Sequence, residues 1–407
     1  MKQLTTITLL LLSMQTIAKT IVVQPTNSIN DAISVAQNGD TVLIKKGTYK
    51  TGNVVINKSI TILGENYPVL DGEDKYEIFT VSGSNILIDG LHFHRSGYSA
   101  MNDYAAVDLV DASLVTISNN IFTDNYFGIH VANSSYFTIR GNRLLGLTKT
   151  EQTTGNGIHL WKCKYALVEY NESQKHRDGI YFEFVTESLV RRNISHDNIR
   201  YGLHFMFSNN DVYSGNTFQN NGAGVAVMFS NHVTMLNNLF DKNWGSSAYG
   251  LLLKEISNGA IQHNTFRENT VGIQMEGANN LQVVQNTFQS NGWAARVQAS
   301  CSANNFQSNN FFSNTFDVAT NGQLVLNTFN NNYWDKYDGY DINKDGFGDI
   351  PYHPTSMYAM VIEQNPNSVI LLRSFMVTLL EKAEKAIPSL TPELLRDEKP
   401  IMKPVKL

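Results

Sequence analysis

Short runs of alternating apolar and polar residues, each opened by a glycine, recur through the middle of the chain. The runs read GIHLW, GIYFE, GLHFM, GVAVM, GLLLK and GIQME, and they begin at Gly157, Gly179, Gly202, Gly224, Gly250 and Gly272. The glycines are separated by 22, 23, 22, 26 and 22 residues. A repeat of this length is typical of a solenoid. Alternation within each run places every second residue on one face, so Ile158, Ile180 and Leu203 are expected inside.

A second motif, asparagine followed two residues later by an aromatic or aliphatic residue, runs between the glycine motifs. It occurs at Asn120, Asn142, Asn216, Asn238, Asn264, Asn286, Asn314 and Asn327, and Asn193 keeps the spacing although Ser195 takes the apolar place. Short apolar and aromatic runs punctuated by Gly and Asn favour strands joined by tight turns, and no helical period is present here. The sequence therefore predicts a right-handed parallel β-helix of about 22-residue coils, stacked about 4.8 Å apart, with asparagine ladders at the corners.

The N-terminal part predicts export and a cap. Residues 1–18 carry Lys2, an apolar run and a small-residue end, which is the pattern of a signal peptide. Residues 19–50 are expected to form the cap and first coil, with a short helix whose apolar face contains Ile29, Ile33 and Ala36 and which Gly39 ends. The β-helix is then expected to span 51–332.

Residues 333–354 form an acidic segment at the expected end of the solenoid. Oxygen ligands with the spacing of an EF-hand loop are supplied by Asp341, Asn343, Asp345 and Asp349, with the backbone carbonyl of Phe347. Position 12 of the loop is Tyr352 rather than the usual glutamate. We expect a structural Ca²⁺, or else Mg²⁺, at this loop; the alternative is a cluster of Asx turns without a metal.

Residues 355–407 are expected to form a helical extension and an extended arm. The helix is predicted from Val369 to Ile387, and its apolar face contains Leu372, Phe375, Met376, Leu379 and Leu380. This face either folds back as a cap or docks on another protein. Four prolines from Pro388 to Pro404 favour an extended arm after the helix.

Stacked coils place equivalent outward residues in rows, and the central rows contain histidine and methionine. The side chains that gather there are His159, Glu183, His204, Met206 and Met228. Imidazole and thioether groups together suit copper, especially Cu(I). The sequence therefore predicts a weak, transient copper site with His204, Met206 and Met228 as ligands and His159 and Glu183 as neighbours, against the alternative that these are ordinary surface or packing residues.

Other functions of the same fold remain open from the residues alone. A polysaccharide lyase or epimerase could draw its base and carboxylates from His176, Arg177, Asp178, Tyr181 and Glu183, although the outer rows carry little positive charge for a polyanion. A structural adhesin is a third reading. The net charge of −5 disfavours nucleic acid. Six coils separate Cys163 from Cys301, so no disulfide is expected between them.

Several longer strings resemble the NosD family. They are RDGIYFEFV (177–185), RYGLHFMFSNN (200–210), YGLLLKEI (249–256), NGWAARVQASC (291–301), NYWDKYDGYDINKDGFGDIPY (332–352) and the segment 363–395. The resemblance implies a non-catalytic periplasmic β-helix protein that delivers copper for nitrous oxide reductase maturation. It also implies the partners: an ABC-type ATPase and permease joined through the C-terminal region, a copper chaperone lipoprotein, and the apo nitrous oxide reductase.

Overall fold

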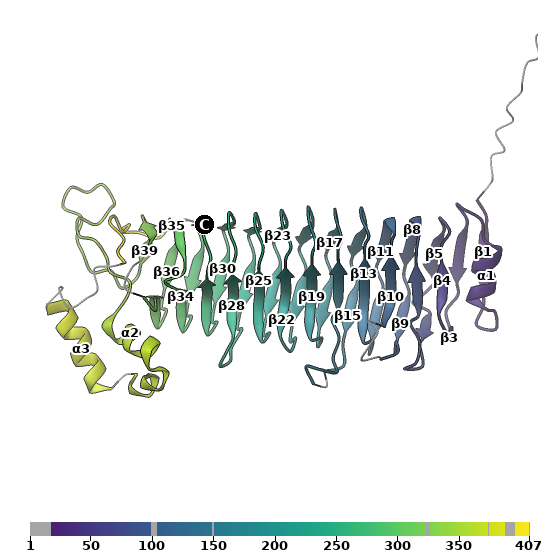
Figure 1. Ribbon diagram of the computed structural model, residues 1–407, viewed down its shortest axis with the longest axis horizontal. Helices are drawn as coiled ribbons and strands as arrows, with labels where there is room; N and C mark the ends of the chain where they lie inside the picture. The colour runs from purple at the N-terminus through teal and green to yellow at the C-terminus, as the bar shows by residue number, and fades with distance from the viewer. Residues whose placement is uncertain are drawn as a thin grey trace, which may run out of the picture.

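The predicted parallel β-helix is confirmed. The computed structural model describes residues 18–98, 104–148, 150–322, 326–372, 374–386 and 395–406, so the expected signal peptide lies almost wholly outside them. Three parallel sheets of 14, 13 and 12 strands, called sheets A, B and C, run the length of one elongated tube (Figure 1). From β2 to β37 each coil contributes one strand to each sheet, so neighbours in a sheet are three strands apart in sequence, while β1 pairs directly with β2.

Each sheet takes its strands in the order of the chain. Sheet A contains β1 (Thr20–Val23), β2 (Thr41–Ile44), β5 (Thr61–Gly64), β8 (Ser84–Asp89), β11 (Ser113–Ser118), β14 (Thr138–Arg140), β17 (Leu167–Glu169), β20 (Leu189–Arg191), β23 (Val212–Ser214), β26 (Thr234–Leu236), β29 (Ala260–Gln262), β32 (Gln282–Val284), β35 (Ser302–Gln307) and β38 (Leu326–Asn330). Sheet B contains β3 (Thr48–Lys50), β6 (Val69–Asp71), β9 (His92–His94), β12 (Ile121–Thr123), β15 (Arg143–Leu145), β18 (Glu172–Gln174), β21 (Ile194–His196), β24 (Thr217–Gln219), β27 (Leu239–Asp241), β30 (Thr265–Arg267), β33 (Thr287–Gln289), β36 (Asn310–Phe312) and β39 (Tyr333–Trp334). Sheet C contains β4 (Val54–Ile56), β7 (Phe79–Val81), β10 (Ala105–Val110), β13 (Phe127–Ala132), β16 (Ile158–Trp161), β19 (Asp178–Glu183), β22 (Tyr201–Met206), β25 (Ala223–Met228), β28 (Tyr249–Lys254), β31 (Val271–Glu276), β34 (Trp293–Val297) and β37 (Phe316–Ala319).

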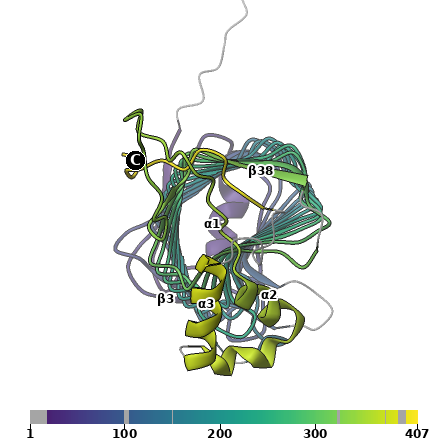
Figure 2. The ribbon, with the colours of Figure 1, turned by 90° about the vertical axis from the view of Figure 1, so that its left-hand side faces the viewer.

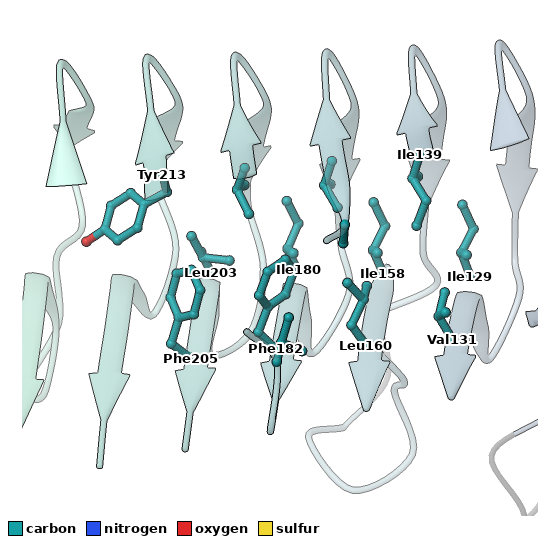
Figure 3. Close-up of a cluster of buried hydrophobic side chains, with 14 of the residues drawn as sticks. Ile129, Val131, Ile139, Ile158, Leu160, Ile180, Phe182, Leu203, Phe205 and Tyr213 are labelled. Carbon is teal, nitrogen blue, oxygen red and sulfur yellow. The ribbon is translucent and has the colours of Figure 1, made fainter. Parts of the chain in front are cut away.

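The glycine motifs form sheet C, and their inward residues stack as predicted. Register pairs Ile158 with Ile180, Ile180 with Leu203, and so on through Val225, Leu251 and Ile273. All six side chains are fully buried. Figure 3 shows part of this column, with Ile129, Ile158, Ile180 and Leu203 side by side on successive coils. A coil cannot bury its apolar face alone, so this shared column is what holds the coils together.

The asparagines form ladders, but they divide among more than one corner. In the longest ladder each side-chain oxygen accepts from the backbone N–H of the previous member. Its members are Asn120, Asn142, Asn171, Asn193, Asn216, Asn238, Asn264, Asn286, Asn309 and Asn332. The motif asparagine Asn314 instead ends a second ladder that begins at Asn198, and Asn327 pairs with Asn304 at a third corner.

The N-terminal cap is confirmed, with a shorter helix than expected. Helix α1 (Ile29–Val35) is capped by the Ser28 hydroxyl, which accepts from Asp31 N, and it ends four residues before Gly39. The Lys58 ammonium group donates to three carbonyls at its C-terminal end. The apolar face packs on the first coils, and Figure 2 shows α1 across the far end of the tube. The helix therefore shields strand edges and core from water.

The C-terminal extension contains two helices rather than one. Helix α2 (Met357–Gln364) was not predicted, a 3₁₀ helix η1 (Pro366–Leu371) follows, and α3 (Phe375–Ala386) begins six residues after the predicted start at Val369. Ile387, the predicted end, lies outside the described residues. The α2–α3 pair packs against the outer face of sheet C, where a small apolar cluster forms from Trp293, Phe316, Tyr358, Ala359, Ile362, Val377 and Leu380. Figure 2 places both helices beside the end of the tube.

The last described segment, 395–406, closes the solenoid. It was expected to be an extended arm, and it is extended, but it lies against the last coil. The carboxylate of the fully buried Asp397 accepts from Asn332 N and Nδ2 and from Trp334 Nε1, so it ends the longest asparagine ladder. Further along, Ile401 N donates to Asn332 O. This segment, and not the helices, is the C-terminal cap.

Candidate functional site

The candidate copper ligands lie on two rows of the outer face of sheet C. The row two residues after the glycines, called the middle row, contains Asp108, His130, His159, Tyr181, His204 and Ala226. The row two residues further along, called the thioether row, contains Trp161, Glu183, Met206, Met228 and Lys254. Regular strand register sets both rows, because successive coils of sheet C pair without a bulge from β13 to β31.

The thioether row brings Glu183, Met206 and Met228 together. The three residues are register partners on β19, β22 and β25, and each is half-buried. Adjacent strands lie about 4.8 Å apart, so the two sulfur atoms can reach one ion between them. The Tyr181 hydroxyl donates to Met206 Sδ at 3.6 Å. Thioether sulfur and a nearby carboxylate are accessible here without any unfolding of the coil.

His204 is near the thioether row but is more buried than expected. Its ring stacks on Tyr181 with 4.5 Å between centroids and packs against Tyr201 at 4.8 Å, and only 4% of the residue is exposed. Its Nδ1 lies 3.7 Å from Asp178 Oδ2, too far for a hydrogen bond, and neither ring nitrogen has a hydrogen-bond partner. Asp178 therefore does not orient this ring by a hydrogen bond, as carboxylates commonly do for metal-binding histidines.

His159 does not join His204. The Tyr181 ring lies between them, 4.7 Å from His159 and 4.5 Å from His204 between centroids. The expectation that His159 is a neighbour of the His204 and methionine ligands is therefore not supported by the geometry, because an aromatic ring fills the space that a shared ion would need. His159 contacts His130 on the preceding coil instead, with 5.1 Å between ring centroids.

Three phenylalanines border the thioether row on its solvent side. Phe184, Phe207 and Phe229 directly follow Glu183, Met206 and Met228, and their rings stack at 5.1 Å with 37–43% of each residue exposed. All three have positive φ. The same turn position holds Lys162 one coil earlier and Glu255 one coil later. An aromatic residue in this strained conformation thus occurs in the three coils that carry the candidate ligands.

The cysteines offer no thiolate. Both are free, in agreement with the expectation of no disulfide between them, and both are buried. Burial raises the pKa of the Cys163 thiol to about 11, and burial likewise raises the pKa of Cys301. The thiolate is the form that binds metal. Within the described part of the chain, no three His, Cys, Asp or Glu side chains lie close enough together to hold a metal ion.

The acidic loop is held by its own carboxylates. Asp341 accepts from the backbone of Asp345 and Gly346, Asp345 accepts from Phe347 N, and Asp349 accepts from Ile342 N. These are the contacts of the Asx-turn alternative. The C-terminal segment also grips the loop, since Met402 N donates to Gly346 O and Gly348 N donates to Pro400 O. Asn343 Nδ2 donates to Asp345 Oδ2, so the Asn343 side chain belongs to the same hydrogen-bonded cluster as the loop carboxylates.

The predicted docking residues of the C-terminal helix are mostly exposed. Phe375 is 79% exposed, Met376 66%, Leu379 50% and Leu372 38%. Leu380 instead packs against the cluster that joins α2 to sheet C. None of the helices in the described ranges has the length and apolar character that crossing a bilayer requires.

Comparison with known proteins identifies the central part of the chain. Residues 146–345 match the family described as "Periplasmic copper-binding protein (NosD)", and residues 16–149 match a family described as a right-handed β-helix region. Residues 146–345 are a NosD-family domain. The resemblance seen in the sequence is thereby confirmed. The NosD domain includes both candidate rows from His159 to Met228 and reaches Asp345 in the acidic loop.

Curated relatives carry the NosD name over most of their length. A protein of Pseudomonas aeruginosa named "Probable ABC transporter binding protein NosD" is 27% identical, with 86% of this chain and 86% of the relative covered. One of Stutzerimonas stutzeri with the same name is 28% identical, with 88% and 85% covered.

Solved structures of other proteins share the β-helix fold of this chain. The Streptococcus pneumoniae surface adhesin PfbA has a TM-score of 0.61 at 13% identity, covering 72% of this chain and 94% of that one. The Dettilon tailspike protein scores 0.57 at 12% identity, covering 75% and 70%. An exopolygalacturonase from Thermotoga maritima scores 0.51 at 11%, covering 76% and 90%. At such identities the likeness shows the fold alone.

Proposed function

We propose that this protein is a non-catalytic periplasmic component that binds copper in transit and delivers it for the maturation of nitrous oxide reductase. The observation that carries the proposal is the thioether row, where Met206 and Met228 are register partners on the accessible face of the NosD domain. Thioether ligands favour Cu(I) over harder ions. Few ligands on an open strand give weak binding, which suits a protein that must pass its metal on.

The partners belong to the same proposal. The relatives are named as ABC transporter binding proteins. The membrane permease, which works with a cytoplasmic ATPase, would bind the exposed face of η1 and α3. A copper chaperone lipoprotein would supply the ion, and the apo reductase would receive it. The inner-membrane location follows from the permease contact. A Ca²⁺ or Mg²⁺ ion in the acidic loop would stabilise the coil next to that contact.

The rival function is a lyase or epimerase of the same fold. Its base would have to come from the middle of sheet C, where Tyr181 and Asp178 lie. Burial, together with the nearby carboxylate of Glu183, raises the pKa of Tyr181 well above its usual range, and Asp178 is fully buried. Two surface hollows of about 310 and 540 Å³ have linings that include neither residue. These observations favour a binding protein over a catalyst.

The test is anaerobic Cu(I) titration of the mature protein and of a variant carrying both Met206→Leu and Met228→Leu. Leucine keeps the volume and removes the sulfur. We expect the double variant to lose the sulfur signal in copper X-ray absorption, together with reductase maturation in cells. The matched control is Met235→Leu with Met275→Leu, because both thioethers are fully buried in the core. Unchanged copper affinity and maturation in the first variant would refute the thioether site.

A further inference from the structure

A second pair of ligand-type side chains lies on the middle row, on the N-terminal side of Tyr181. His130 on β13 and His159 on β16 are register partners on adjacent coils, and their ring centroids are 5.1 Å apart at 66°. Asp108 on β10 precedes them in the same row. The expectation from the sequence placed His159 with His204, so the pairing with His130 was missed.

His159 is buried without any hydrogen-bond partner for its ring. Both Nδ1 and Nε2 are enclosed and unpaired, and its walls are the rings of Phe127 at 5.5 Å, His130 at 5.1 Å and Tyr181 at 4.7 Å between centroids. A buried polar group without a partner is costly and calls for an explanation. A neutral imidazole has a proton on one nitrogen and keeps on the other the lone pair that a metal needs.

His130 is oriented by Asp108. Its Nδ1 and Asp108 Oδ1 are 2.7 Å apart, and the two side chains are only 12% and 15% exposed. A carboxylate beside Nδ1 accepts a hydrogen bond from the N–H of that nitrogen, which favours the tautomer with its lone pair on Nε2. This is the arrangement by which proteins fix the tautomer of a metal-binding histidine.

We propose that His130 and His159 together bind one Cu(I) ion through two neutral imidazoles, with Asp108 as a positioning residue, at a site separate from the thioether row. This inference rests on the proposed function, because the ion is the copper in transit. Zinc also binds imidazole, but structural zinc takes four ligands. In the described residues no third histidine, cysteine or carboxylate completes such a set. A two-ligand site therefore favours Cu(I), which accepts low coordination.

The two sites would hold copper on either side of the Tyr181 ring. That ring contacts His159 on one side and His204 on the other, while its hydroxyl contacts Met206. Copper could then occupy an imidazole site and a thioether site on the two sides of the β19 coil, on one rigid face. The wild-type protein should accordingly bind two equivalents of Cu(I), one with nitrogen ligands only and one with sulfur.

The experiment is anaerobic Cu(I) titration of the full mature chain against a chromogenic Cu(I) chelator, with X-ray absorption on each loaded sample. The variant His159→Phe keeps an aromatic ring between its aromatic neighbours and should lose the nitrogen-only equivalent while the sulfur equivalent remains. If the His159→Phe variant does not fold, His130→Gln tests the loss of the same copper equivalent, at a position that is more exposed than His159. His263→Asn, at a turn remote from the middle row, is the matched control and should keep both equivalents.

The outcomes separate this inference from the proposed function. Loss of one equivalent in His159→Phe, with the sulfur signal intact, supports the imidazole site even if the methionine variant changes nothing. Two equivalents retained in both His159→Phe and His130→Gln would overturn it while leaving the thioether site standing. Asp108→Asn should lower the Cu(I) affinity of the nitrogen-only site by roughly tenfold, because a carboxylate that orients a metal-binding histidine is lost. Asp108→Glu should restore the affinity. Equal affinity in Asp108→Asn and Asp108→Glu would remove the positioning role.

Discussion

Replacement of Asp397 by alanine should loosen the C-terminal end of the solenoid. The carboxylate is fully buried and ends the longest asparagine ladder. Two buried donors, Asn332 N at 2.9 Å and Trp334 Nε1 at 3.1 Å, have no other acceptor among their described hydrogen bonds. The part-buried Asn331 N also donates to this carboxylate, at 3.1 Å. Asn332 Nδ2 is less dependent on it, because that amide also donates to Phe306 O.

The expected magnitude follows from the two orphaned donors. A buried donor left without its acceptor costs about 1–3 kcal/mol, so Asp397→Ala should destabilise the closed end by about 2–6 kcal/mol. Segment 395–406 keeps its other contacts in this variant, among them Ile401 N to Asn332 O, the backbone pair of Asp397 with Tyr352, and Val405 with Asn310. The loss should therefore be local, and the central coils should keep their stability.

The assay is amide hydrogen exchange on β38, β39 and segment 395–406. A loss of about 2 kcal/mol or more corresponds to exchange at least about 30-fold faster there. The control is Glu398→Ala, whose exposed side chain pairs with Arg396 and should change exchange little. Wild-type protection of Asn331 and Asn332 in Asp397→Ala would show that the carboxylate does not close the ladder.

Three further predictions concern pH, metal and docking. Burial lowers the pKa of His176 from 6.5 to about 4, so between these pH values the unfolded chain binds more protons than the folded one. The free energy of unfolding should therefore fall by up to about 3 kcal/mol as the pH drops from 6.5 towards 4. In denaturant titrations, His176→Phe should flatten this dependence on pH. If the acidic loop holds Ca²⁺ or Mg²⁺, a chelator should lower the melting temperature and metal analysis of the purified protein should find the ion, whereas no change in either would favour the Asx-turn cluster. Phe375→Asp with Leu379→Asp should leave the β-helix folded and abolish co-purification with the permease, because a charge would be buried in an apolar contact, while the exposed control Thr378→Asp should retain it.

The coil architecture could be predicted from the sequence because one short period controls both backbone and core. Glycine spacing gave the coil length, and alternation within each run gave the inward column from Ile158 to Ile273. The asparagine motif predicted ladders but not their number, because Asn314 and Asn286 look alike in sequence while they occupy different corners. Corner identity depends on the position within the coil, which the motif alone does not give.

The ends could not be predicted in the same way, because no repeat extends into them. Helix α2 has only eight residues, and it was missed because residues 357–362 are all apolar, so no helical period of apolar and polar residues stands out. The role of segment 395–406 depends on Asp397, a single buried acid that pairs with an amide 65 residues earlier. A contact at that separation leaves no local pattern in the sequence.

The site was predicted in part, because rows are fixed by register while side-chain packing is not. Sequence spacing placed Met206 beside Met228 and His159 two coils from His204. It did not show that the Tyr181 ring would fill the space between the two histidines. It also did not single out Asp108 and His130, although both stand in the same row; a carboxylate followed one coil later by a histidine was the signal available.

The position of the C-terminal helices gives the metal rows a fixed relation to the proposed transporter contact. Arg296 on β34, in the middle row, forms a two-bond ion pair with Glu363 of α2, at 2.8 and 2.7 Å. Sheet C leads from β25, which carries Met228, to β34 in three coil steps, a distance of about 14 Å at about 4.8 Å per step. The solenoid has continuous register between these strands and offers no hinge. A permease that holds α3 would therefore also set the direction in which the copper-binding face points, and a partner that exchanges copper with Met206 and Met228 would meet that face in one orientation.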